Sequence, residues 1–351
     1  RPPRSTRYAS SAASDVYKGQ TYMNSKNYIL IVAGEPNSIF LEIFFKSLNR
    51  IKIKKPIILI GSLKLVKLQM SKLKYKKKIK VLKSDDIFDL KINNNTLNLI
   101  NVDYNPTKAF ENISSKSNDY ILMCFKIAFK IINKYKITKF INGPVNKKTF
   151  LNKKFKGVTE YVSKSFKIKK NAMLIYNKKL SVCPITTHLP IKAVSKNISK
   201  KTIVEKILLI HDFYKKQNRK AKIALIGLNP HCETIDKFDE DEEILRPAVK
   251  KLKKKGLNIS GPFAADTIFL KKNRSKYNVI VGMYHDQVLT PMKTIFEYDA
   301  INITLGLPFL RVSPDHGPNE KMLGKNISNP LSLIRAIQFL EKNWLKPKKV
   351  L

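Results

Sequence analysis

The chain has 351 residues, of which 43% are hydrophobic and 9% aromatic, and its Lys and Arg residues give it a formal charge of +42. This length exceeds what one core usually supports, so we expect two lobes with ordinary globular cores. The sequence contains no run of 18 or more apolar residues, so we expect no membrane span. Its lysines are scattered over almost every segment. We therefore attribute the charge to composition rather than to a specific nucleic-acid interface, and expect it to attract anionic substrates.

The cysteines and the first residues of the chain indicate the compartment. Cys124, Cys183 and Cys232 are odd in number and lack CxxC spacing. A disulfide framework is therefore not expected, and we predict a reducing, cytoplasmic setting. Residues 1–22 have no apolar core of a secretory signal, so we interpret them as a disordered extension before Met23.

Short apolar runs alternate with helical periodicity along the chain. Strands are predicted at 28–33, 56–60, 99–102, 139–142, 223–226, 279–281 and 301–304. Helices are predicted at 39–48, 63–74, 119–134, 200–214, 240–254 and 330–344, with Ser62 as an N-cap and a kink at Pro247. Residues 172–176 and 180–185 predict an antiparallel hairpin. The pattern therefore predicts a two-domain α/β/α fold, with a mostly parallel sheet and an antiparallel element.

Histidines follow several of the predicted strands. His188, His231 and His285 each lie in a loop just after a strand, where α/β proteins build their sites. Three such imidazoles can bind one metal ion and leave positions open for a substrate. Taken singly, each histidine would more often be a surface or hydrogen-bonded residue, so the shared placement carries the prediction. His211, inside a predicted helix, is interpreted as structural.

Other polar residues near these loops are candidates for binding and acid–base chemistry. Asp266 lies in a loop and is a candidate base, although loop aspartates are more often turn caps. Asp286 follows His285 and could orient its ring. Lys293 is both a candidate base and a candidate anion ligand. Arg311 ends an apolar run and offers a planar fork to phosphate or carboxylate.

Two common nucleotide-binding patterns are absent. The sequence contains neither GxGxxG nor GxxxxGK[ST], so the cofactor-binding residues stay unassigned. From the residues alone, the prediction is a metal-dependent α/β enzyme that acts on an anionic substrate. The metal could be zinc, cobalt or magnesium.

Several loop motifs, in order, resemble those of the 4-hydroxythreonine-4-phosphate dehydrogenase family between Tyr28 and Trp344. They are Gly34-Glu35-Pro36, Gly143-Pro144-Val145, Thr186-Thr187-His188-Leu189-Pro190, Gly227-Leu228-Asn229-Pro230-His231, Ala265-Asp266-Thr267, Tyr284-His285-Asp286-Gln287, Asn302 to Phe309 and Asp315-His316-Gly317. The resemblance implies an isocitrate or isopropylmalate dehydrogenase-like fold, which binds NAD without GxGxxG. It also implies a homodimer whose active site is shared at the subunit interface.

The resemblance implies an activity in pyridoxal phosphate biosynthesis. The expected reaction is oxidation of 4-phosphooxy-L-threonine with NAD (or NADP) and decarboxylation to 3-amino-2-oxopropyl phosphate. The implied metal ligands are His188, His231 and His285. The implied substrate contacts are Thr159, Lys293, Asn302 and Arg311. The expected domains are 23–142 with 312–351, and 143–311, which carries the metal and substrate loops.

One departure from the family pattern bears on the substrate. The family has Gly-His-Thr-Glu where this chain has Gly157, Val158, Thr159 and Glu160. Because valine cannot donate a hydrogen bond, a related enzyme acting on another phosphorylated hydroxy acid, such as a four-carbon sugar acid, remains an alternative. A basic nucleic-acid-binding protein is a more remote one, since no binding motif supports it.

Overall fold

The computed structural model describes residues 28–85, 87, 92–146, 149–150, 155 and 157–342. The predicted extension at 1–22 and Met23 lie outside these residues. Contacts divide the described chain into two units. The first unit holds 28–144 and 318–328, and the second holds the described residues within 145–317 and 329–342.

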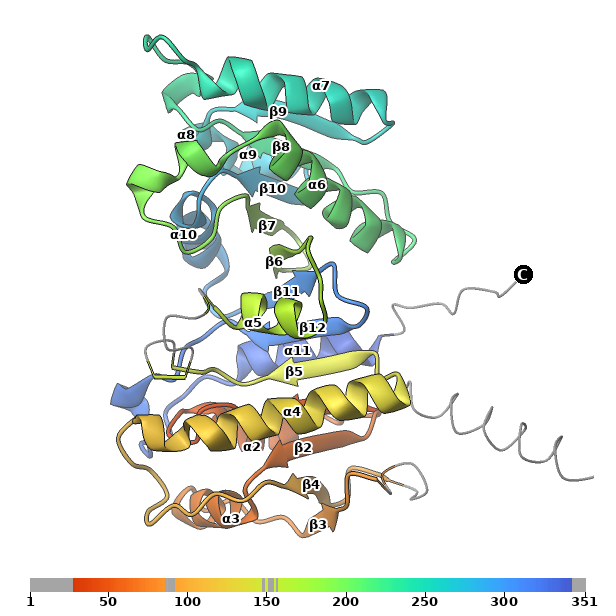
Figure 1. Ribbon diagram of the computed structural model, residues 1–351, viewed down its shortest axis with the longest axis vertical. Helices are drawn as coiled ribbons and strands as arrows, with labels where there is room; N and C mark the ends of the chain where they lie inside the picture. Colours follow the sequence, from red (N-terminus) through yellow and green to blue (C-terminus); the bar gives the residue numbers. More distant parts are fainter. Residues whose placement is uncertain are drawn as a thin grey trace, which may run out of the picture. The chain divides into compact units, whose positions relative to one another are not determined.

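The first unit is built on a parallel sheet with the strand order β3-β4-β2-β1-β5 (Figure 1). Its elements are β1 (Ile29–Val32), α2 (Phe40–Arg50), β2 (Ile57–Gly61), α3 (Leu63–Lys72), β3 (Ile79–Leu82), β4 (Leu97–Asn101), η1 (Ser115–Ser117), α4 (Asn118–Tyr135), β5 (Lys139–Asn142) and η6 (Glu320–Met322). Every residue of β1, β2 and β5 is buried. Such continuous burial is typical of parallel strands, which are covered on both faces.

Local signals account for the helix boundaries of this unit. The Ser62 side chain accepts a hydrogen bond from the Leu65 amide, which confirms the predicted N-cap of α3. Helix α4 packs on β1 and β2 and ends at Lys136, which has the left-handed φ of 53°. The edge strand β3 was not predicted, because it has only four residues, of which one, Leu82, is buried, and so it lacks a buried apolar run.

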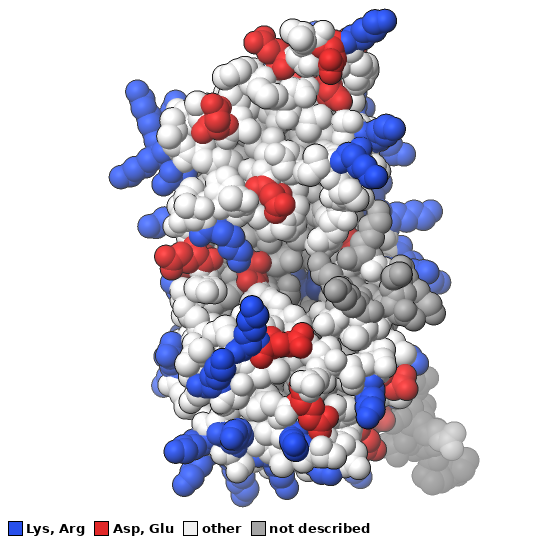
Figure 2. Space-filling model, turned by 90° about the vertical axis from the view of Figure 1, so that its left-hand side faces the viewer, with Lys and Arg blue, Asp and Glu red and all other residues white. Residues whose placement is uncertain are grey.

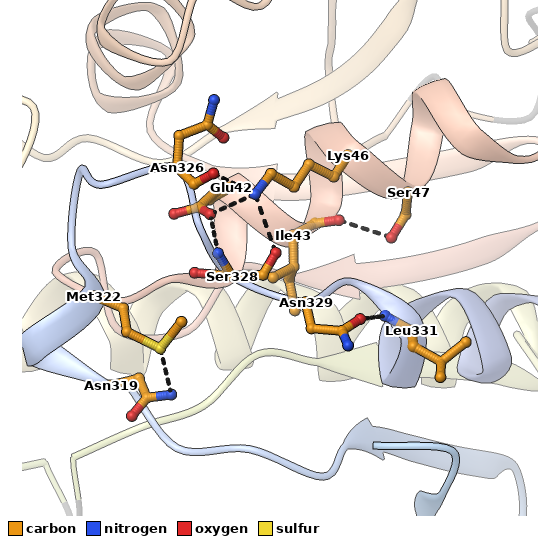
Figure 3. Close-up of polar contacts among 10 residues, drawn as sticks. All are labelled: Glu42, Ile43, Lys46, Ser47, Asn319, Met322, Asn326, Ser328, Asn329 and Leu331. Atoms are coloured by element: carbon orange, nitrogen blue, oxygen red, sulfur yellow. Dashed lines mark hydrogen bonds and ion pairs between the residues drawn. The ribbon is translucent and has the colours of Figure 1, made fainter. Parts of the chain in front are cut away.

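Segment 318–328 returns to the first unit and is held on α2 by a buried carboxylate (Figure 3). Glu42, 1% exposed, accepts from the Ser328 amide at 2.7 Å and from Lys46 Nζ at 2.8 Å. Lys46 Nζ also donates to the carbonyls of Asn326 at 2.8 Å and Ser328 at 3.0 Å. The network satisfies backbone groups of the segment, so a short stretch far along the chain is tied to the first helix of this unit.

The second unit has the strand order β12-β11-β6-β7-β10-β8-β9 (Figure 1). Its elements are α5 (Val158–Ser165), β6 (Ala172–Tyr176), β7 (Ser181–Pro184), η2 (Ile191–Ala193), η3 (Ser195–Asn197), α6 (Lys200–Lys215), β8 (Ile223–Ile226), η4 (Pro230–Cys232), η5 (Asp241–Leu245), α7 (Arg246–Lys254), β9 (Ile259–Phe263), α8 (Ala265–Ile268), α9 (Lys271–Arg274), β10 (Val279–Gly282), α10 (His285–Phe296), β11 (Ile301–Leu305), β12 (Leu310–Pro314) and α11 (Leu331–Glu341). Strands β7, β10, β8 and β9 are parallel, whereas β12, β11, β6 and β7 pair antiparallel. The predicted fold class and the β6–β7 hairpin are thereby confirmed.

Helices cover both faces of this second sheet. Met173 and Ile175 of β6 belong to a buried cluster with Val288 and Met292 of α10. Tyr176, one position along, contacts the ring of Phe213 on α6 at 6.1 Å. Since successive strand residues point to opposite faces, α10 and α6 cover opposite faces of the sheet. The strands are therefore held by apolar packing on both sides, and their carboxyl ends are left to carry loops.

Two predicted details turned out differently. The helix predicted at 240–254 is divided into the π-helical turn η5 and the α-helix α7. Pro247 lacks the amide that would bond to the Glu243 carbonyl, so the regular ladder breaks at that point. The last helix begins at Leu331, with Asn329 Oδ1 accepting from its amide at 3.0 Å, and ends at Glu341 rather than at 344.

The two units also divide the chain differently from the expected domains. The expected division placed 312–351 with the first domain and 143–311 in the second. In the structure β12 pairs with β11, and α11 packs on both strands. Strand pairing and helix packing therefore keep these elements in the second unit, and only 318–328 returns to the first.

The length of the helices and the distribution of surface charge relate to membrane and nucleic-acid binding. Among the residues that the structure describes, no helix is both long and apolar enough to cross a membrane. On the face drawn in Figure 2, Lys and Arg side chains lie scattered and interspersed with Asp and Glu.

Candidate functional site

The three predicted histidine loops start from neighbouring parallel strands of the second unit. His188 follows β7, His231 follows β8 and His285 opens α10 directly after β10. Strand β10 lies between β7 and β8 in the sheet. Because parallel strands end at the same edge, all three loops emerge side by side at the carboxyl edge of this sheet.

Two of the three imidazoles lie close together. The ring centroids of His188 and His285 are 5.8 Å apart, with 35° between the ring planes. His285 Nδ1 lies 2.8 Å from Asp286 Oδ1, which leaves its Nε2 available to a ligand. The predicted role of Asp286 in orienting His285 therefore agrees with this geometry. His188 takes a left-handed backbone φ of 54°, a conformation uncommon for residues other than glycine.

His231 lies apart from this pair. It sits in η4 with a left-handed φ of 57°, and its side chain is exposed. The next residue, Cys232, is buried and has a left-handed φ of 67°. Burial raises the pKa of its thiol. Within the described ranges, no group of three His, Cys, Asp or Glu side chains lies close enough to hold a metal ion. One chain alone therefore brings together two of the three predicted ligands.

Two of the four predicted substrate contacts, Arg311 and Thr159, are hydrogen-bonded to each other. Arg311, on β12, is 2% exposed, and its Nη1 donates to Thr159 Oγ1 at 3.0 Å and to Thr304 Oγ1. Burial lowers the pKa of Arg311 to about 10, and the nearby Glu160 opposes that shift. The guanidinium still carries its charge at neutral pH, so it forms a fixed cationic centre beside α5.

The remaining predicted polar residues lie on β11, α10 and α8. Asn302 Oδ1 is buried and has no hydrogen-bond partner among the residues described. Lys293 Nζ forms an ion pair with Asp315 and also donates to the Asp315 carbonyl at 3.2 Å. Asp266 is exposed in the first turn of α8, after β9. The predicted base candidates thus differ: Lys293 is engaged by a carboxylate, whereas Asp266 faces solvent.

Charged residues that the sequence did not single out line a cavity of about 350 Å³ next to the His188 loop. Glu160, Thr187 and Lys206 line it, and Glu160 Oε2 is buried without a hydrogen-bond partner in the described part of the chain. Burial lowers the pKa of Lys206, while Cys183 and Glu160 raise it. No sequence pattern indicated a role for Glu160. Lys206 lies in α6, where its position in the helix does not distinguish it from the other lysines.

The first unit brings together the two glycine-containing motifs near the start of the chain. The Glu35 amide donates to the Pro144 carbonyl at 2.8 Å, and a Cβ on Gly34 would lie 2.4 Å from the same oxygen. Only glycine permits so close an approach. The Glu35 side chain is buried, which raises its pKa, although bonds from the Asn37 amide and Ser117 lower it. The two motifs therefore lie in contact with each other just after the ends of β1 and β5.

Together, the mostly parallel strands and the polar loops at their ends define an α/β enzyme that handles a small anionic ligand. Residues 52–340 match the family model described as "Pyridoxal phosphate biosynthetic protein PdxA". The chain belongs to this family of pyridoxal phosphate biosynthesis. The predicted family is thereby confirmed.

Individual relatives are similar over most of the chain. A 4-hydroxythreonine-4-phosphate dehydrogenase of Sulfurihydrogenibium sp. (strain YO3AOP1) is 35% identical over 88% of this chain and 96% of its own. The crystal structure of a protein of that name from Klebsiella pneumoniae has a TM-score of 0.77 and 25% identity, covering 90% of this chain and 100% of its own. An Oceanobacillus iheyensis relative, provisionally named D-threonate 4-phosphate dehydrogenase, is 29% identical over 90% of this chain and 97% of its own.

Proposed function

We propose that the chain oxidises 4-phosphooxy-L-threonine with NAD and decarboxylates the product to 3-amino-2-oxopropyl phosphate. The observation that carries the proposal is the pair of imidazoles, His188 and His285, 5.8 Å apart at the edge of the sheet. Thr187 and Leu189, on either side of His188 in the chain, line a cavity whose wall also carries lysine and glutamate side chains. Membership of the PdxA family supports the same reaction. NADP is the second candidate for the oxidant.

The donor set suits a divalent metal ion. Imidazole is a common ligand of zinc and cobalt, and magnesium would need additional oxygen ligands. His188, His231 and His285 would hold the ion. When bound, such an ion supplies a Lewis acid that lowers the pKa of a substrate hydroxyl and stabilises negative charge on a carbonyl oxygen. The Asp286 carboxylate, 2.8 Å from His285 Nδ1, keeps the opposite ring nitrogen free for coordination.

The chain's own polar groups would bind and orient the substrate. Arg311 and Thr159 would hold the phosphate or carboxylate, since a guanidinium fork matches such anions. Asn302 Oδ1, buried and without a partner among the described residues, would accept a hydrogen bond from the substrate. Lys293 would contact the substrate anion beside Asp315, and because a carboxylate already engages it, Asp266 is the favoured proton acceptor.

We infer that the enzyme is a cytoplasmic homodimer with shared active sites. Large apolar side chains are exposed in the loops that follow His188 and His231: Ile191 is 68% exposed, and Phe238 is 54% exposed. Exposed apolar side chains near a site are often covered by a partner. A shared site would also allow each subunit to donate histidines to the other, which suits the separate position of His231.

A second candidate substrate is D-threonate 4-phosphate. It is favoured by the provisional name of the Oceanobacillus iheyensis relative and by Val158, which stands where the family has a histidine. D-threonate 4-phosphate carries a hydroxyl group where phosphooxy-threonine carries an amine. A kcat/KM ratio between the two substrates distinguishes these candidates.

NADH formation tests the proposed reaction directly. We expect 4-phosphooxy-L-threonine and NAD to yield NADH in the presence of zinc, cobalt or magnesium. Removing the metal with a chelator should lower the rate at least 100-fold, since a Lewis acid contributes several kcal/mol to such a step. Restoring the metal should restore the rate. Preference for D-threonate 4-phosphate would favour the second candidate, and no NADH from either substrate with any metal would contradict the proposal.

A further inference from the structure

A glutamine side chain links two of the histidine loops in the second unit. Gln287, on the first turn of α10, accepts a hydrogen bond from the Met283 amide at 2.7 Å through Oε1. Its Nε2 donates to the Gly227 carbonyl at 2.7 Å. Met283 precedes His285 by two residues, and Gly227 precedes His231 by four. One side chain therefore connects the start of the His285 loop with the start of the His231 loop.

The third loop bonds to the same residue, Met283. The Thr186 amide donates to the Met283 carbonyl at 3.0 Å, and Thr186 Oγ1 donates to that carbonyl at 2.7 Å. Thr186 is buried and precedes His188 by two residues. Met283 thus bonds to Gln287 through its amide and to Thr186 through its carbonyl. The His188 loop therefore bonds to Met283 directly, and the His231 loop is connected to it through Gln287.

The surroundings leave these links little freedom. A Cβ on Gly282 would lie 2.9 Å from Gln287 Oε1 and 2.4 Å from a Val288 methyl carbon, so glycine makes room for the side chain. In the His231 loop, the buried Asp241 carboxylate accepts from the amides of Leu228 and Asn229, both at 3.0 Å. Hydrogen bonds therefore fix the first three residues of this loop, Gly227, Leu228 and Asn229. The bond from Gln287 connects the loop to Met283, which follows β10.

We propose that Gln287 is a positioning residue for the metal site, setting the His231 loop against the His285 loop. The inference rests on the proposed function, because it assigns Gln287 a role in placing the histidines proposed as ligands. Gln287 acts through the two backbone groups it joins, not by touching the metal. The link lies within one chain, so it fixes the position of each loop on the sheet edge of that chain.

The substitution Gln287→Glu tests this role most sharply. Glutamate has nearly the same shape and can still accept from the Met283 amide. It cannot donate to the Gly227 carbonyl when ionised, so two oxygens would face each other there. We expect the dissociation constant for zinc alone, measured by competition with a chromophoric chelator, to rise about 10- to 100-fold, the usual cost of losing a support of metal ligands.

A matched control uses the buried glutamine of the first unit. Gln69 Nε2 donates to the carbonyls of Pro36 at 3.0 Å and Ala109 at 2.8 Å. Gln69→Glu therefore loses comparable bonds away from the histidine loops, and we expect its zinc affinity to stay within about twofold of the unmodified chain. Melting temperatures of both variants separate a loss of stability from a loss of metal affinity.

A second variant protects the test against misfolding. Thr186→Val keeps the shape of the side chain and removes only the hydroxyl bond to Met283, so a smaller rise in the zinc dissociation constant is expected. Unchanged zinc affinity in Gln287→Glu and in Thr186→Val, with tight binding by the unmodified chain, would overturn the inference and leave the proposed function standing. If the unmodified chain binds no zinc, cobalt or magnesium, the inference and the proposed metal site both fail.

Discussion

Replacing Arg311 with lysine is expected to lower kcat/KM about 100-fold while the chain stays folded. Arg311 is 2% exposed and bonds through Nη1 to Thr159 and Thr304. Lysine keeps the charge but not the planar fork, so hydrogen bonds to a substrate anion and to these hydroxyls cannot all form. Loss of a buried, charge-assisted contact costs about 3 kcal/mol, which corresponds to about 100-fold.

The matched control for this variant is Arg335→Lys in the same unit. Arg335 forms an ion pair with Asp299 at 2.6 Å, and both side chains are 37% exposed. Such partly exposed pairs contribute little, so we expect kcat/KM to change less than about twofold. Steady-state kinetics with circular dichroism as a check of folding measures both variants. Equal effects in the two variants would show that Arg311 has no special role in binding the substrate.

Replacing His285 with alanine is expected to abolish turnover, with kcat/KM falling about 1,000-fold or more. The variant removes one imidazole of the close pair and leaves Asp286 without its partner. Loss of a ligand weakens the metal whose Lewis acidity contributes several kcal/mol. His188→Ala should have a similar effect, because its ring is the neighbour at 5.8 Å.

The control for the histidine variants is His211→Ala. His211 lies within α6, away from the three strand-end loops, and was interpreted as structural. We expect this variant to keep kcat/KM within about threefold, as is usual for partly exposed residues outside a site. Activity retained in His285→Ala, or lost equally in His211→Ala, would remove the assignment of the imidazole pair to the reaction.

The fold could be predicted to a large extent because buried parallel strands have a simple signature. Residues 29–32 and 57–61 are continuous apolar runs, and both form strands of the first unit. The edge strand at 79–82 and the helix at 285–296 were missed. The former has four residues, of which only one is buried, and the latter begins soon after a strand and contains Pro291. Apolar periodicity is weak in both, so the rest of the fold decides their structure.

The candidate site could be predicted only in part. Strand-end placement correctly indicated that the three histidine loops share one edge of the sheet, since β7, β10 and β8 are neighbours. Arg311 was a candidate from its residue type and position, and Thr159 came from the resemblance, but their hydrogen bond across 152 positions was not predicted. Side-chain links such as that of Gln287 to Gly227 depend on loop geometry, which no local pattern reveals. Convergence of all three imidazoles on one metal stays a prediction.

X-ray absorption of the zinc-loaded protein in solution tests the central claim most directly. The account predicts zinc bound by three imidazole nitrogens at about 2.0–2.1 Å, with one imidazole lost from the spectrum in His231→Ala. This outcome would place His231 with His188 and His285 around one ion, whichever subunit supplies it. A spectrum with sulfur from Cys232 as a ligand, or one unchanged in His231→Ala, would contradict the account.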